Sequence, residues 1–200
     1  MQLKDYSGIS LTGHIKIYDY HTKEILVDKL NAIHYESFSV SLAESISNSS
    51  KGWIYEMAFG NGGTNVDPTG IITYLTPNST GINASLYNET YSKIVDNNSV
   101  LNVDPIRNKI ETRHVVGKNY TDVFVSCLLD FGEPNDQEAF DKSTDNSSKY
   151  IFDELGLRSY SPDGNGRLLT HVIFHPVQKS LNRAIQIDYT VRIMTLTGGM

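Results

Sequence analysis

Apolar and polar residues alternate over residues 185–193 of the chain. The apolar members are Ile185, Ile187, Tyr189, Val191 and Ile193, and the polar members between them are Gln186, Asp188, Thr190 and Arg192. Successive side chains of a β-strand point to opposite faces of its sheet, so a period of two separates these two sets. The pattern predicts a half-buried strand of an antiparallel sheet.

Further β-prone runs, separated by turn residues, recur through the rest of the chain. Residues 14–18 and 24–30 predict an N-terminal hairpin, because a five-residue loop lies between them. Other strands are predicted at residues 53–59, 110–116, 122–129, 150–152, 168–174 and 181–193. About eight strands favour a mainly β fold, either an antiparallel β-sandwich or a barrel-like sheet.

One segment shows the helical period instead. Phe38, Leu42, Ala43 and Ile46 recur at spacings of four, one and three, and Asn48-Ser49-Ser50 follows them. This spacing predicts a helix within residues 37–47. A helical turn is also expected near residues 87–94, so the sheet would carry one or two short helices.

Residues 64–108 predict a long inserted loop region. This excursion contains Pro68, Pro77 and Pro105 with many Asn and Gly residues, and its apolar islands are short. A loop of this length in a compact domain is typically functional or in contact with something. We expect the 200 residues to form a single β-rich domain, with this excursion and an N-terminal arm at residues 1–10 making contacts between subunits.

Composition narrows the classes of partner. The formal net charge of -6 gives no general attraction to nucleic acid or to anionic membranes, so no nucleic-acid role is expected. No run approaches the ~20 apolar residues of a membrane span, so no membrane insertion is expected. The single Cys127 lies in an apolar run, which predicts a buried free thiol. We expect the protein to be made in a cytosol.

Two motifs resemble ligand sites only in part. Gly60-Asn61-Gly62-Gly63-Thr64 follows a predicted strand, but it lacks the Gly-Lys-Ser/Thr ending of a phosphate-binding loop and leads into no predicted helix. His171 and His175 lie on one predicted strand, about 13 Å apart at ~3.3 Å per residue, which is too far to share a metal ion. We therefore expect no cofactor and no metal-binding residue.

Two acidic pairs are candidates for acid and base in glycoside cleavage: Asp130 with Glu133, and Asp153 with Glu154. Solvated charges at turns and strand ends are the interpretation that the sequence favours, since most carboxylates lie at surfaces. No catalytic residue is therefore expected, and the chain is interpreted as a protein that is not an enzyme.

Tyrosine is unusually frequent, with twelve Tyr against one Trp. Tyr near loops and strand ends suits protein interfaces, because its ring is apolar and its hydroxyl is polar. The alternative is that these rings fill the edges of the core. The interface candidates are Tyr74, Tyr87, Tyr91, Tyr120 and Tyr160.

Several stretches together resemble structural proteins of tailed bacteriophages. They are Gly13 to Tyr18, Asn31 to Tyr35, Leu42 to Ile46, Ile54 to Thr64, Leu86 to Lys93 and His171 to Arg183. Their order of hairpin, bend, helix and strand ending in a Gly-Asn-Gly-Gly turn is similar to that of tail, neck and baseplate components.

The resemblance implies a virion protein at the tail, at the neck (the head-tail connection) or at the baseplate. Its partners would be further copies of itself, in a symmetric homo-oligomer, and other phage structural proteins. A capsid decoration protein is the nearest alternative, followed by a receptor-binding or carbohydrate-binding virion module in which Trp53 and exposed Tyr stack on sugars. A glycan hydrolase is the last alternative.

Overall fold

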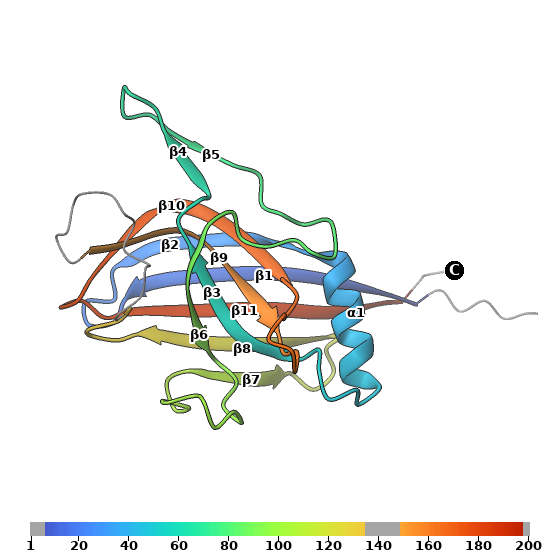
Figure 1. Cartoon of the computed structure of the whole chain (residues 1–200). Coiled ribbons are helices and arrows are strands. Elements are labelled where there is room, and N and C mark those ends of the chain that lie inside the picture. The colour runs from blue at the N-terminus through green and yellow to red at the C-terminus, as the bar shows by residue number, and fades with distance from the viewer. Residues whose placement is uncertain (1–6, 135–148, 198–200) are drawn as a thin grey trace, which may run out of the picture.

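A large curled antiparallel sheet dominates the computed structural model, which describes residues 7–134 and 149–197 (Figure 1). The elements are β1 (Ser7–Asp19), β2 (Ile25–Ile33), α1 (Tyr35–Ile46), β3 (Ile54–Gly60), β4 (Thr64–Val66), β5 (Ile72–Tyr74), β6 (Glu89–Ile94), β7 (Lys109–His114), β8 (Tyr120–Leu129), β9 (Lys149–Ser159), β10 (Thr170–Ser180) and β11 (Ile185–Thr197). Over these residues, the sheet has the order β6-β3-β9-β10-β2-β1-β11-β8-β7, and β4 pairs with β5 apart from it. The expected mainly β fold with a barrel-like sheet is confirmed.

The first and last strands lie side by side in the middle of this sheet. β1 pairs with β11 from Ser7↔Thr197 to Asp19↔Ile185 and with β2 as the expected hairpin. Tyr189 and Val191 of β11 are fully buried, whereas Thr190 between them is not. The period of two therefore predicted the face of this strand correctly.

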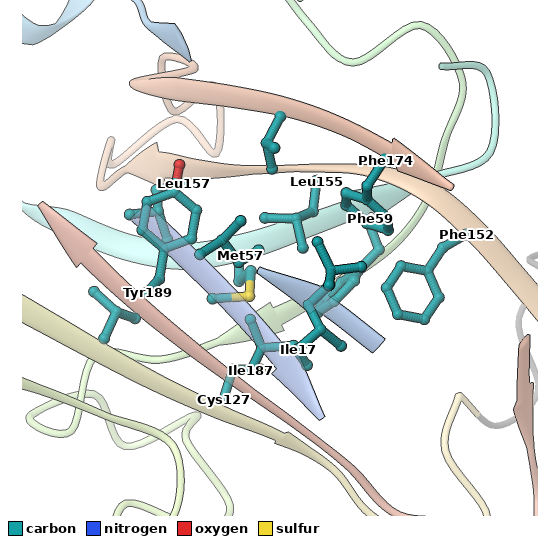
Figure 2. Close-up of a cluster of buried hydrophobic side chains, with 14 of the residues drawn as sticks. Ile17, Met57, Phe59, Cys127, Phe152, Leu155, Leu157, Phe174, Ile187 and Tyr189 are labelled. Carbon is teal, nitrogen blue, oxygen red and sulfur yellow. The ribbon is translucent and has the colours of Figure 1, made fainter. Parts of the chain in front are cut away.

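The sheet curls into a half-barrel, so that its two halves face each other across the core. Only two residue pairs join β10 to β2, with Thr170 opposite Ile33, and this short junction separates the β6-β3-β9-β10 half from the other half. Figure 2 shows Ile17 and Ile187 of one half close to Met57 of the other. Cys127 lies in the same core with no exposed surface, as its apolar run predicted.

The helix α1 stands beside one end of the strands (Figure 1). His34 caps it, because the Nδ1 atom of His34 accepts a hydrogen bond of 3.1 Å from the Ser37 amide. Phe38 is buried on the helix face that turns towards the sheet. The helix expected within residues 37–47 is confirmed and is slightly longer.

The helical turn expected at residues 87–94 is wrong. Glu89–Ile94 is strand β6, and it pairs antiparallel with β3, with Tyr91 opposite Phe59. The outer edge of β3 offers unpaired backbone groups, and Thr90 and Tyr91 are residues that favour strands. Pairing with that edge therefore overrides the weak helical pattern.

Three other expected elements have different ends in the structure. The strand expected at residues 150–152 continues through Asp153 and Glu154 to Ser159, because Leu155 and Leu157 are buried in the core. Residues 7–10 of the expected arm belong to β1 and pair with β11, and residues 1–6 lie outside the described residues. The strand expected from residue 181 begins at Ile185, after a turn.

Candidate functional site

The excursion is the part of the chain that departs most from the sheet. Between β3 and β6 it makes the β4–β5 hairpin, which stands away from the sheet in Figure 1, and then a segment of residues 75–88 without regular strands. Between β6 and β7 it makes a second loop, residues 95–108. Each part is tied to the sheet by buried polar side chains, so the excursion is held in one position.

Glu154 of β9 is the centre of the first attachment. Its side chain has no exposed surface, and its Oε1 atom accepts hydrogen bonds from the amides of Gly62 (3.1 Å) and Asn88 (2.8 Å). Its Oε2 atom accepts from the Tyr87 amide (3.0 Å) and from His171 Nε2 (2.9 Å). Burial raises the pKa of Glu154, but these four hydrogen bonds outweigh burial and bring the pKa below its ordinary value.

Asp153 makes the neighbouring attachment. Its Oδ1 atom accepts from the Gly63 amide at 2.9 Å, and its Oδ2 atom accepts from the amide and the hydroxyl of Thr64. Burial raises the pKa of Asp153 more than these bonds lower it. The amides of Gly62, Gly63 and Thr64, which a phosphate-binding loop would offer to a ligand, are thus bonded to carboxylates of the protein itself.

Two buried histidines hold the segment 75–88. The Nδ1 atom of His171 accepts from the Asn78 amide at 2.8 Å, so its Nε2 atom carries the proton that is donated to Glu154. The Nε2 atom of His34 lies 2.9 Å from the Gly81 carbonyl oxygen and donates to it, because its Nδ1 atom accepts from α1. Neither histidine has exposed surface. His171 therefore orders a loop, and His175 lies exposed on the same strand near Tyr74.

The loop between β6 and β7 exposes four large aliphatic side chains, and we call residues 99–106 the aliphatic loop. The exposed fractions are 97% for Val100, 65% for Leu101, 88% for Val103 and 80% for Ile106. Isolated exposed apolar residues are ordinary, but four within seven positions concentrate exposed apolar side chains in one loop.

Asn102 and Asn108 hold the aliphatic loop from below. The Nδ2 atom of Asn102 donates to the carbonyls of Asp96 (3.1 Å) and Asn108 (2.8 Å), and its Oδ1 atom accepts from the Asp104 amide (3.1 Å). The Oδ1 atom of Asn108 accepts from the Leu128 amide in β8 at 2.8 Å. Both asparagines are buried, so a polar core beneath the loop fixes its apolar surface in the outward position.

A pocket of about 400 Å³ lies between α1 and the sheet. Phe38 and Leu42 of α1 form one wall, and apolar side chains of several strands, Ile54 and Ile193 among them, form the others. Trp53 also lines the pocket and is 39% exposed. Its ring stacks on Tyr160 with 4.6 Å between ring centroids, and its Nε1 atom donates to Asp96 at 3.1 Å.

The five candidate tyrosines lie in different environments. Tyr74 and Tyr87 are about half exposed, and the Tyr87 hydroxyl donates to the Thr76 carbonyl at 2.6 Å. Tyr91 packs on Phe59 of the core, while Tyr160 packs on Trp53. Tyr120 lies under the Arg192 guanidinium, 4.0 Å from ring centroid to the guanidinium carbon. The five tyrosines therefore differ in their neighbours and in their exposure.

The second acidic pair is tied into a turn. Asp130 pairs with Arg107 at 2.7 Å, and Glu133 accepts from the Asp130 amide at 2.8 Å and pairs with Lys93. Lys179 donates to the carbonyls of Asp130 and Glu133, and burial lowers the pKa of Lys179 to about 8. In both acidic pairs the carboxylates accept hydrogen bonds from the protein or form ion pairs with it. These contacts hold the neighbouring loops in position.

Residues 7–134 and 149–197 contain no group of three or more His, Cys, Asp or Glu side chains placed to hold a metal ion. In the same residues no helix has the length and apolar character needed to cross a bilayer. Comparison of the chain with protein-family models, curated proteins and solved structures found no match.

Sequence reasoning missed three features of this region. It treated Glu154 and His171 in separate hypotheses, and it found neither the pocket nor the aliphatic loop. The sequence Val100-Leu101-Asn102-Val103-Asp104-Pro105-Ile106 does carry a signal for the loop, because four aliphatic residues stand among turn-forming ones. The pocket has no such signal, since its lining comes from distant parts of the chain.

Proposed function

We propose that this chain is a structural subunit of a tailed bacteriophage virion. Its place would be in the tail, the neck or the baseplate, and it would act by self-assembly and by contacts with other structural proteins of the particle. The observation that carries the assembly part of this proposal is the aliphatic loop. The resemblance of the hairpin, helix and Gly-Asn-Gly-Gly stretches to phage structural proteins supports the virion part.

An exposed aliphatic surface gains free energy when a partner covers it. Burying a Val, Leu or Ile side chain that was exposed is favourable by about 1.5–3 kcal/mol, so four such side chains give a substantial driving force for association. The surface is held by Asn102 and Asn108 and does not need to be ordered on binding. A preorganised apolar surface of this kind favours a role in protein contacts.

The first test is the mass of the purified protein across a concentration series, measured by light scattering behind size exclusion. A discrete oligomer at a multiple of the 22.4 kDa chain supports a ring or lattice subunit. A chain that stays monomeric at every concentration contradicts self-assembly, and it favours the capsid decoration alternative, in which the chain binds a preformed surface.

Trp53 favours a second candidate function, a carbohydrate-binding or receptor-binding module. Its ring is partly exposed beside the pocket, and Asp96, Asn97 and Asn98 supply polar groups near it. Sugars are bound by aromatic faces together with such polar groups. Because Trp53 is the only tryptophan, its fluorescence reports directly on this site, and saturable changes on titration with a glycan series would support this function.

A further inference from the structure

We propose that the aliphatic loop of one copy of this chain inserts into the pocket beside α1 of a second copy. The inference rests on the proposed function, since it names the surfaces through which the subunit would assemble. It follows from three properties of the molecule, which are the shape of the loop, the size and lining of the pocket, and the charges around both.

The aliphatic loop presents exposed apolar side chains on a fixed base. Val100, Val103 and Ile106 are each at least 80% exposed, so little of their surface is covered by their own chain. The hydrogen bonds of Asn102 to Asp96 and Asn108 hold the base of the loop. The loop therefore presents its apolar side chains without a large loss of conformational freedom on binding.

The pocket has an apolar lining and a volume suited to aliphatic side chains. Its apolar lining combines Phe38 and Leu42 of α1 with Ile110, Val123, Leu169 and Ile193. A cavity of about 150 Å³ accommodates one benzene ring, so a pocket of about 400 Å³ has room for two or three aliphatic side chains. The pocket thus has room for two or three of the four aliphatic side chains that the loop exposes.

The charged groups beside the loop and the pocket already have partners within their own chain. Asp104 and Arg107 at the end of the aliphatic loop pair with each other, so the loop brings no unpaired charge to the contact. At the pocket, the Asp96 carboxylate accepts hydrogen bonds from Trp53 and from the Asn98 amide. An apolar projection and an apolar pocket on one chain give a contact that repeats from copy to copy.

The test uses variants at both surfaces. Val103→Asp with Ile106→Asp places charge on the loop, and both positions are exposed, so folding is retained. Ser45→Arg and Asn98→Arg, made separately, obstruct the pocket from α1 and from the opposite side, at two exposed lining residues. The matched control is Val115→Asp with Val116→Asp, which charges an exposed apolar pair in the β7–β8 turn.

Mass by light scattering and Trp53 emission are recorded over the same concentration series. We expect the wild type to assemble, with its emission moving to shorter wavelength as the pocket fills. The loop variant and both pocket variants should associate at least tenfold more weakly, without the shift, and the control should behave like the wild type. An equal mixture of loop and pocket variants should form heterodimers, because each supplies the surface that the other lacks.

The outcomes separate this inference from the function on which it rests. A wild type that stays monomeric contradicts both. A wild type that assembles while the loop and pocket variants assemble equally well overturns the inference and leaves self-assembly intact. Loss of assembly in the loop variant alone, without loss in either pocket variant, also overturns it, because the loop would then have another receptor. Failure of the mixture to recover association overturns it as well.

Discussion

The Glu154 attachment and the aliphatic loop reverse the usual positions of polar and apolar groups. At the first, a carboxylate with no exposed surface lies inside the molecule and is fully hydrogen-bonded. At the second, four aliphatic side chains lie outside and are 65% to 97% exposed. The buried polar group has all its partners within the subunit, so the first region serves folding, whereas the second is the surface on which the proposed association depends.

The largest effect is expected from Glu154→Leu. This change leaves the amides of Gly62, Tyr87 and Asn88 and the Nε2–H group of His171 without their acceptor in a buried site. Each unsatisfied group costs about 1–3 kcal/mol, so the free energy of unfolding should fall by about 4 kcal/mol or more. Urea unfolding followed by circular dichroism measures the loss. Glu24→Gln, at a side chain that is 69% exposed, is the control and should leave stability almost unchanged.

A smaller loss is expected from Asn102→Ala. This substitution removes two donated hydrogen bonds and one accepted bond beneath the aliphatic loop. The expected decrease in the free energy of unfolding is about 2 kcal/mol, with the β-sheet signal retained. Hydrogen exchange should show faster exchange confined to residues 95–108. Unchanged exchange there would mean that Asn102 does not hold the loop.

Acid should weaken the Glu154 attachment. The pKa of Glu154 in the folded state lies below its ordinary value of about 4.3, so the folded state binds this proton less readily than the unfolded state does. Its contribution to stability is therefore complete above pH 4.3 and is lost as the pH falls through the folded-state pKa. Asp153 has a raised pKa and acts in the opposite direction. The comparison that isolates Glu154 is wild type against Glu154→Gln, whose stability should decline less between pH 6 and pH 3.

The smallest effect on folding is expected from Val103→Asp alone. Since Val103 is 88% exposed, its replacement should change the free energy of unfolding by about 0.5 kcal/mol or less, measured at a concentration where the chain is monomeric. A decrease in the free energy of unfolding above about 2 kcal/mol would show that the aliphatic loop packs on its own subunit. Val103 would then contribute to folding, as Glu154 does.

The sheet could largely be predicted from the sequence, because local alternation decides which side chains are buried. Ile187, Tyr189 and Val191 follow that rule, and so do Ile15 and Ile17. β6 was missed because its conformation depends on pairing with β3, which is a long-range effect. Asp153 and Glu154 were expected at the surface, since the sequence does not show that the excursion returns to cover them.

The candidate site was readable only in part, because its components meet through tertiary structure. Residues 64–108 were identified as an excursion, which the structure describes as a hairpin, a tied segment, an edge strand and the aliphatic loop. The contact of His171 with Asn78 joins residues 93 positions apart, and no local pattern encodes it. The sequence therefore indicated where the chain leaves the sheet, and the structure shows which side chains attach the excursion to the sheet.

The pairing of β1 with β11 has a consequence for the nascent chain. β1 is made before β11, so its longest ladder, which runs from Ser7↔Thr197 to Asp19↔Ile185, waits until β11 has been synthesised. Until then, one edge of β1 carries unpaired backbone groups that could join a strand of another polypeptide. Contacts so distant in sequence slow folding, because a long loop must close first. The sheet is therefore expected to fold late, after β11 has left the ribosome.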